Sequence, residues 1–197
     1  MTDAITIDGY TFHPVRLYLH QTGIQNQFKN YQNKTVLQTV GKSRYSKLRP
    51  TVERKYPVSL NEPLGEFLYS LKMNEDKFYL RFLNPYGDET YSKFSIKVHL
   101  HEIGLYVYAR GSEIVYIGKT TDSIGKRINY GYGNISPKNC YLDGQATNCH
   151  LNSLITKCWN EVSFYFHSEN NPSEINQLER RLINRFQPKW NIALKNK

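Results

Sequence analysis

Alternating hydrophobic and polar positions form the most regular pattern in the middle of the chain. From Phe94 to His101, apolar side chains take every second position and polar side chains the positions between. A strand with one buried and one solvent-facing side has this alternation, so it predicts a β-strand within a strand-rich region, residues 77–109. Residues 104–120 form two apolar runs around a polar turn, which predicts a β-hairpin, and residues 161–167 alternate again as another strand.

Apolar residues at helical spacing predict helices near residues 61–72, 121–130, 151–159 and 172–187. For the second of these, Thr121 or Asp122 is the expected cap. The last helix is the best defined, because Asn171 can cap it, Pro172 suits its first position and Pro188 ends it.

Two polar segments separate these elements. Residues 131–148 are rich in Gly, Pro and Asn, which predicts a long surface loop, and such loops are often functional. Residues 41–50 are basic around one tyrosine, which is typical either of a solvated loop or helix face or of a segment that follows a phosphate backbone. In the second case the contacts would come from Lys42, Arg44, Lys47 and Arg49.

Composition points to a polyanionic partner. The 197 residues contain 26 Lys and Arg against 17 Asp and Glu, a net charge of +9, which favours nucleic acid first and an anionic membrane surface second. The sixteen tyrosines and nine phenylalanines suit stacking on bases, although core packing explains most aromatic residues. No apolar run is long enough to span a membrane and the first ten residues lack a secretory signal, so we expect a soluble, cytoplasmic protein.

Three cysteines, Cys140, Cys149 and Cys158, are an odd number in one third of the chain, which argues against a disulfide framework. Together with His150 they raise the alternative of a zinc site. Their spacing lacks the close pairs of structural zinc sites, so buried or free thiols are expected.

One charged residue, Glu179, falls inside the apolar stripe of the last predicted helix. Burying an unpaired carboxylate is costly, so Glu179 should meet a cation, a metal or water in a cleft. Arg127 lies similarly between Ile124 and Ile128. Its guanidinium suits bidentate phosphate contact, and a structural salt bridge with Glu179 is the alternative.

Together with Tyr106 from one hairpin strand and Tyr116 from the other, this set of groups suits phosphodiester hydrolysis. That reaction needs a deprotonated water or hydroxyl, an arginine to stabilise the phosphorane and a divalent cation on a carboxylate to hold the leaving oxygen. For either tyrosine taken alone, packing on a sheet is the alternative.

Two tripeptides mark the hairpin, Gly104-Leu105-Tyr106 and Tyr116-Ile117-Gly118. Arg127, Glu179 and Asn191 follow in order. In these positions the sequence resembles the GIY-YIG nucleases, over residues 102–191. Many family members carry His or Tyr four residues after the arginine, where this chain has Gly131, and we predict that the neighbouring Tyr130 takes that role.

The resemblance implies an α+β fold, with a GIY-YIG-like core of three antiparallel strands flanked by helices. Residues 101–197 would form the catalytic domain, with an inserted loop at about 131–148. Residues 1–100 lie outside the resemblance, and we expect them to form a mixed N-terminal extension that contributes strands and DNA contacts.

The resemblance also implies the roles of the site residues. Glu179 would bind Mg²⁺ or Mn²⁺, Arg127 the scissile phosphate, and Tyr106 or Tyr116 would act as general base or orienting donor. A tyrosine is a poor base unless a neighbour such as Lys119, Arg127 or the metal lowers its pKa. Asn191 would close the motif.

Within this family, a compact enzyme with an N-terminal extension most resembles the type II restriction endonucleases, which cut double-stranded DNA at a specific sequence. One active site cuts one strand, so a homodimer is expected. Amides and a cation in the predicted loop suit base reading, or simply face water: Asn134, Lys138, Asn139, Gln145 and Asn148. The alternatives are a nonspecific, repair or mobile-element nicking nuclease, and an inactive DNA-binding module.

Overall fold

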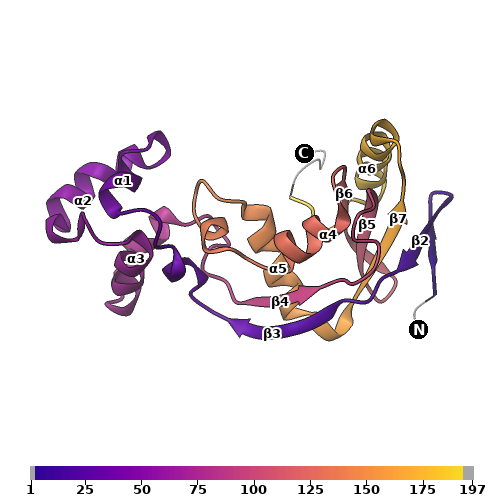
Figure 1. Ribbon diagram of the computed structural model, residues 1–197, viewed down its shortest axis with the longest axis horizontal. Helices are drawn as coiled ribbons and strands as arrows, with labels where there is room; N and C mark the ends of the chain where they lie inside the picture. Colours follow the sequence, from indigo (N-terminus) through magenta and orange to yellow (C-terminus); the bar gives the residue numbers. More distant parts are fainter. Residues whose placement is uncertain (1–2, 193–197) are drawn as a thin grey trace. The chain divides into compact units, whose positions relative to one another are not determined.

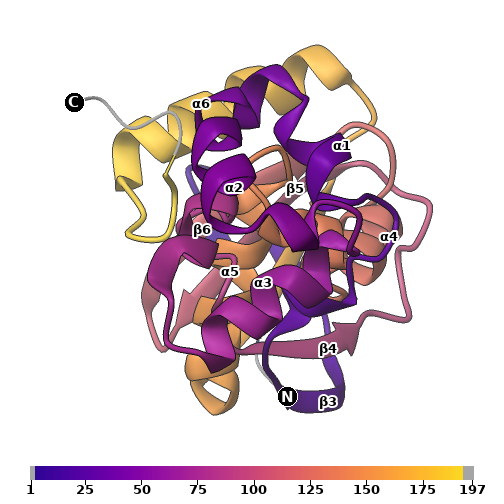
Figure 2. The same cartoon turned by 90° about the vertical axis from the view of Figure 1, so that its left-hand side faces the viewer.

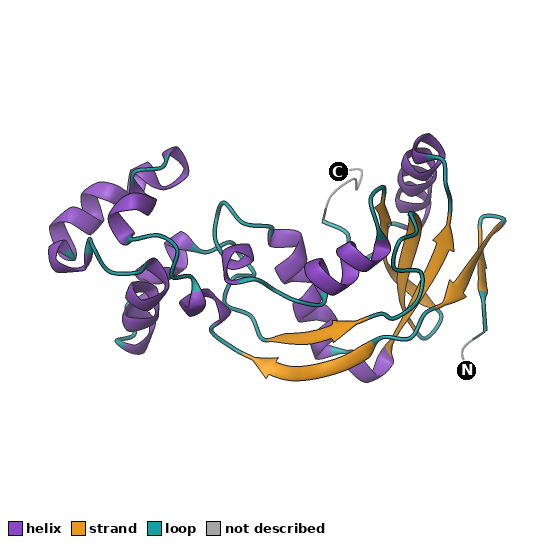
Figure 3. Ribbon diagram, in the orientation of Figure 1, coloured by secondary structure: helices purple, strands orange, loops and turns teal. Residues whose placement is uncertain are grey.

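A five-stranded antiparallel sheet contains the predicted hairpin. In the computed structural model, which describes residues 3–192, the strand order is β1-β2-β7-β5-β6 (Figure 1; strands orange in Figure 3). The bounds are β1 Ile5–Ile7, β2 Tyr10–Pro14, β5 Gly104–Arg110, β6 Glu113–Thr120 and β7 Val162–Ser168. The predicted hairpin, the later strand and the mixed α+β class are therefore confirmed, and an N-terminal hairpin extends the sheet beyond β7.

One face of the sheet packs against α6, Pro172–Phe186 (Figure 1). Leu105 and Val107 of β5 and Leu178 and Leu182 of α6 belong to one buried apolar cluster. The predicted cap is confirmed, because the Asn171 side chain accepts a hydrogen bond of 3.0 Å from the backbone N–H two residues later.

Tyr106, Tyr108 and Tyr116 lie on the opposite face, because successive side chains of a strand alternate between faces. Tyr106 and Tyr108 of β5 contact Phe164 of β7 there. The helix after the hairpin is short, α4 Ile124–Arg127, and continues as a π-helical turn, Ile128–Tyr132. Its cap is Ser123 rather than Thr121 or Asp122, since the Ser123 Oγ accepts from the Lys126 N–H at 3.0 Å.

The chain divides into two compact units, and the division does not fall near residue 100. The first unit contains residues 3–22, 92–134 and 154–192, and the second contains residues 23–91 and 135–153. Both units therefore draw on both sides of the expected boundary.

The second unit is mainly helical (Figure 2). It contains α1 Val36–Val40, α2 Arg49–Lys55, α3 Leu64–Met73, the start of α5 Ala146–Lys157, and several single 3₁₀ turns. The helices predicted at 61–72 and 151–159 are confirmed. Residues 77–82 form a 3₁₀ turn instead of a strand, because the Asp76 side chain accepts from the Phe78 N–H at 2.9 Å and starts a helical turn.

The expected surface loop at 131–148 is largely a packed part of the second unit. Ile135, Cys140 and Tyr141 are buried in its core. The Tyr141 hydroxyl donates to the Phe28 carbonyl at 2.9 Å, and Tyr141 also forms a β-bridge with Leu83. Long-range partners of this kind override the loop-like composition.

The alternating stretch that begins at Phe94 forms only a short strand. β4 Tyr91–Ser95 pairs with β3 Tyr18–Ile24 in a two-stranded sheet, and β4 ends before Ile96. The backbone of Ile96 bonds instead to the Asn129 side chain, as donor at 2.8 Å and as acceptor at 3.1 Å. That amide takes the place of a neighbouring strand.

The three cysteines are free thiols, and Cys140 and Cys149 are buried. Over residues 3–192 no three His, Cys, Asp or Glu side chains are grouped to hold a metal. None of the helices in that range has the length and apolar character needed to cross a bilayer.

Candidate active site

Three tyrosine hydroxyls meet over the β5–β6 hairpin. Tyr106 lies on β5 and Tyr116 on β6, with their rings stacked 6.2 Å apart. The Tyr132 hydroxyl lies 3.0 Å from that of Tyr106 and 3.1 Å from that of Tyr116. Tyr132 therefore joins the two motif tyrosines in one hydrogen-bonded network.

The motif glycines are explained by close packing. Tyr106 pairs with Gly118 across the hairpin, and a Cβ on Gly118 would lie 2.6 Å from the Tyr106 ring. A Cβ on Gly104 would lie 2.0 Å from the His167 carbonyl oxygen, and its φ of +150° also favours glycine. Gly118 therefore leaves room for the Tyr106 ring, whereas Gly104 lets β5 lie close to the backbone of β7.

A π-turn decides which tyrosine reaches the network. The Gly133 N–H bonds to the Ile128 carbonyl, five residues back, at 2.7 Å. A π-turn contains one residue more than a turn of α-helix. Tyr132, five residues after Arg127, therefore lies where the fourth residue after Arg127 would lie in an α-helix. The prediction for Tyr130 is corrected accordingly, because its side chain is 78% exposed whereas Tyr132 is 3% exposed.

Arg127 lies beside this network. Its Cζ is 5.9 Å from the centre of the Tyr132 ring. Burial alone would lower the pKa of Arg127, but the neighbouring tyrosines and the Glu179 carboxylate raise it above its usual value. The guanidinium is therefore a permanent positive charge next to three hydroxyl groups.

Glu179 is buried, as its position in the apolar stripe predicted, and it meets a cation. Its Oε2 lies 2.8 Å from the Nζ of Lys119 on β6. Its negative charge also contributes to the raised pKa values of Arg127 and Tyr116. The two charged residues and the tyrosines therefore share one electrostatic environment around β6.

Tyr106 and Tyr116 are held in the neutral form. Burial is the main cause that raises the pKa of Tyr106 and of Tyr116 well above the usual value. At neutral pH their hydroxyls donate and accept hydrogen bonds without carrying charge.

Asn191 has a positioning role. Its side chain accepts from the Ile117 N–H at 3.0 Å and donates to the Ile117 carbonyl at 2.8 Å. The Trp190 N–H donates to the Val115 carbonyl at 2.8 Å. The C-terminal segment therefore covers the outer edge of β6 and fixes the backbone between Tyr116 and Gly118.

A fourth tyrosine, Tyr108, was not predicted. It is fully buried, with its ring edge-on to those of Tyr106 and Tyr116 at 6.5 and 6.2 Å. Among the described residues its hydroxyl is the one buried side-chain oxygen without a hydrogen-bond partner. Strand alternation was the available signal, because Tyr108 follows Tyr106 by two residues on the same face.

Most candidate DNA-binding residues lie in the second unit, and several have internal partners. Lys42 and Lys138 both pair with Asp143, the former at 3.3 Å. Burial would raise the pKa of Asp143, but the hydrogen bonds from Lys138 and Tyr45 lower it to about 2. These two lysines therefore offer less charge to a phosphate than the sequence suggested.

The other candidates differ in exposure. Arg49 pairs with Glu53 at 2.6 Å, while Arg44 and Lys47 are exposed. Asn134, in the first unit, and Gln145 are also exposed. Asn148 is 5% exposed and donates to the Gln145 side chain at 2.9 Å, so the prediction that it reads bases is wrong for this conformation.

The chemistry of the site has to be judged from its own groups, because no family model, curated protein or solved structure matches this chain. Those groups are neutral hydroxyls that can donate to an anion, a permanent guanidinium and a buried carboxylate. Together they can bind a phosphate group and support a cation next to it.

Proposed function

We propose that this protein is a metal-dependent DNA endonuclease of the GIY-YIG type. The observation that carries the proposal is the convergence of Tyr106, Tyr116, Arg127 and Glu179 on the two sides of one edge strand, β6. These residues come from segments up to about seventy residues apart in the chain, and each lies at its place in the resembling motif.

Arg127 and the tyrosine hydroxyls are the groups that would hold the scissile phosphate. The guanidinium offers a fork of donors that matches two phosphate oxygens. The hydroxyls of Tyr106, Tyr116 and Tyr132 can turn from each other toward an anion, because each can act as donor. Donors fixed before the reaction stabilise charge that develops on the phosphorane.

The Glu179 carboxylate fits a divalent cation such as Mg²⁺ or Mn²⁺. Its Oε2 pairs with Lys119, and among the described residues Glu179 has no other ion-pair partner. Protein sites for Mg²⁺ commonly use one or two carboxylates, with water and substrate phosphate as the other ligands. When bound there, the cation would supply Lewis-acid stabilisation of the phosphate oxygens and the leaving group.

The raised pKa values of Tyr106 and Tyr116 bear on which group removes the proton from the attacking water. A tyrosine that is neutral at pH 7 orients a water or a phosphate oxygen better than it removes a proton. We therefore assign Tyr106 and Tyr116 the orienting role rather than that of general base. Lys119 would release Glu179 and neutralise the phosphate when the cation binds.

Within this class we favour a type II restriction endonuclease that cuts both strands of a specific sequence as a homodimer. The net charge of +9 and the exposed Arg44 and Lys47 support nucleic-acid binding. A nonspecific or nicking nuclease is the second candidate. The observation that favours it is that Lys138 and Asn148, two of the expected base-reading residues, are engaged inside the second unit.

Digestion of a mapped supercoiled plasmid with Mg²⁺ or Mn²⁺ tests the proposal. Discrete fragments indicate a specific endonuclease, a smear a nonspecific one and nicked circles a single-strand cutter. Glu179→Ala and Arg127→Ala should abolish cleavage, whereas Glu161→Ala, which removes a surface ion pair with Arg110, should not. An uncut plasmid with either metal, or full cleavage by Glu179→Ala, would refute the proposal.

A further inference from the structure

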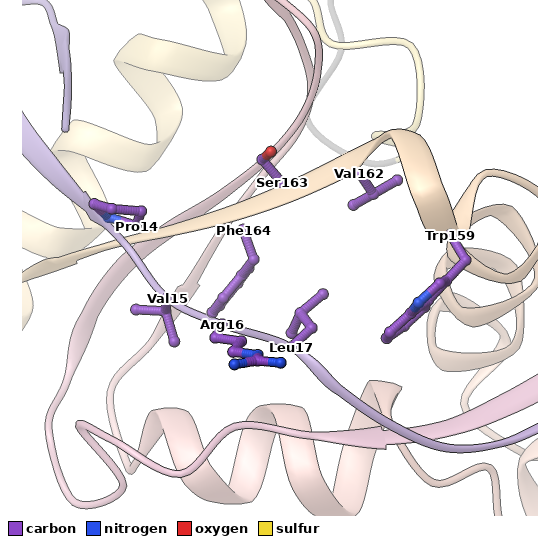
Figure 4. A pocket seen from close by; sticks show the side chains of 8 residues that line it. All are labelled: Pro14, Val15, Arg16, Leu17, Trp159, Val162, Ser163 and Phe164. Carbon is purple, nitrogen blue, oxygen red and sulfur yellow. The ribbon is translucent and has the colours of Figure 1, made fainter. Parts of the chain in front are cut away.

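A pocket of about 600 Å³ opens in the first unit where β2 and β7 separate (Figure 4). The strands are paired up to a bond from the Val15 N–H to the Phe164 carbonyl at 2.8 Å. Beyond this bond the chain at Arg16 and Leu17 leaves β7, and the space between them becomes the pocket. Its volume is within the range of small-molecule sites.

Aromatic and aliphatic side chains line most of this pocket. Figure 4 shows the rings of Phe164 and Trp159 on either side of Leu17. Trp159 is partly exposed, and it precedes β7 in the 3₁₀ turn Trp159–Glu161. A partly exposed indole on an apolar wall suits a flat aromatic ligand, because every nucleobase can stack on it.

Two cations without a carboxylate partner among the described residues lie on the ring of Tyr18, and one of them lines the pocket. Arg16 lines the pocket, and its Cζ is 5.0 Å from the centre of the Tyr18 ring. The Lys97 Nζ lies 4.3 Å from the same ring. Neither cation forms an ion pair with any residue in the range 3–192, so their charge is available to an anion.

The pocket adjoins the candidate active site through one side chain. Phe164 lines the pocket, and its ring also contacts Tyr106 at 6.0 Å and Tyr108 at 4.8 Å. A ligand in the pocket would therefore be one aromatic ring away from the tyrosine network.

We propose that this pocket is a nucleotide subsite, in which Trp159 stacks on a base and Arg16 with Lys97 binds its phosphate. The ligand class follows from an aromatic wall beside two unpaired cations. The proposal rests on the proposed function in one respect, namely that the nucleotide belongs to the DNA substrate. A free nucleotide would have the same chemistry, so the test has separate arms for the two sources.

The first arm is a fluorescence titration of the full chain with the four 5′-deoxynucleoside monophosphates. A nucleotide should change the Trp159 emission, and the matching nucleoside without phosphate should bind at least about tenfold more weakly. The double variant Arg16→Gln with Lys97→Gln should also bind the nucleotide about tenfold more weakly. The matched control is Lys29→Gln with Arg81→Gln, which also removes one lysine and one arginine that lie on aromatic rings, and it should change nothing.

The variant Trp159→Phe tests whether the change in fluorescence comes from Trp159. It should remove the emission change, because the second tryptophan, Trp190, is buried against β6. A change that persists in Trp159→Phe, or a nucleotide affinity that both double variants leave intact, would overturn the subsite.

The second arm measures affinity for a short DNA duplex in Glu179→Gln, which should bind without cutting. If the subsite holds a nucleotide of DNA, Arg16→Gln with Lys97→Gln should lower this affinity about tenfold and reduce the salt slope by about two, while the control pair does not. Unchanged DNA affinity with weakened mononucleotide binding would assign the pocket to a free nucleotide and overturn its role in the substrate. Nucleotide binding without plasmid cleavage would support the subsite and refute the nuclease function. Plasmid cleavage without nucleotide binding would support the nuclease function and refute the subsite.

Discussion

The two units use buried tyrosines in different ways. In the second unit, the buried hydroxyl groups bond to fixed acceptors, which are backbone carbonyls for Tyr91 and Tyr141 and carboxylates for Tyr45 and Tyr79. Tyr45 donates to Asp143, and Tyr79 donates to Asp88 at 2.8 Å. A hydroxyl with a permanent charged acceptor contributes to stability and is not available to a ligand.

In the first unit three buried tyrosines bond to one another. Tyr106 and Tyr116 share the Tyr132 hydroxyl, and Tyr108 has no partner. Bonds between neutral hydroxyls can reverse their direction, so these groups can respond to an incoming phosphate. The comparison teaches that the acceptor, rather than the burial, distinguishes a structural tyrosine from a candidate catalytic one.

The largest effect is expected at Glu179, the carboxylate of the first unit. Glu179→Gln keeps the shape of the side chain but removes the charge that pairs with Lys119 and would hold a cation. Plasmid cleavage should fall by on the order of 10³-fold, measured under single-turnover conditions. Glu161→Gln, which removes a surface ion pair with Arg110, is the control and should cut normally. A Glu179→Gln enzyme within threefold of the wild-type rate would show that this carboxylate has no catalytic role.

A smaller effect, on stability alone, is expected at Tyr79. Tyr79→Phe removes a hydrogen bond to Asp88, which keeps its ion pair with Lys72 at 2.6 Å. The free energy of unfolding should fall by about 1 to 2 kcal/mol in urea denaturation. Cleavage by the folded variant should be unchanged. A loss of cleavage without a loss of stability would contradict the claim that the tyrosines of the second unit are purely structural.

Local signals predicted much of the fold and part of the site. The hairpin depends on its turn, where Gly111 has a φ of +57°, and the last helix depends on its cap Asn171, so the local sequence pattern was sufficient. The place of Glu179 followed from the helical period alone.

Other features depend on partners far along the chain. Tyr141 is buried because it bonds to Phe28, 113 residues away, so its Gly- and Asn-rich surroundings were misleading. Tyr132 enters the site through a π-turn, which an α-helical spacing does not anticipate. The ion pair of Lys42 with Asp143 joins residues far apart in the sequence, so no local pattern predicted it.

The smallest effect is a pH dependence that sharpens the same comparison. Burial, followed by the bond to Asp88, raises the pKa of Tyr79 to about 12, while in the unfolded chain a tyrosine ionises near pH 10. The unfolded state therefore loses its proton first, and the stability from Tyr79 is complete below about pH 10 and declines as the pH rises toward 12. The difference in free energy of unfolding between the wild type and Tyr79→Phe should shrink over that range. A difference that grows with pH would contradict the claim that the neutral Tyr79 hydroxyl stabilises the fold.

The most direct test of the account compares Tyr132→Phe with Tyr130→Phe in the plasmid cleavage assay. These neighbouring tyrosines differ in that only Tyr132 turns inward to bond Tyr106 and Tyr116, whereas Tyr130 is exposed. Tyr132→Phe should slow the single-turnover rate by at least about tenfold, and Tyr130→Phe should cut at the wild-type rate. A slow Tyr130→Phe together with a normal Tyr132→Phe would contradict the claim that the tyrosine network is the reactive centre.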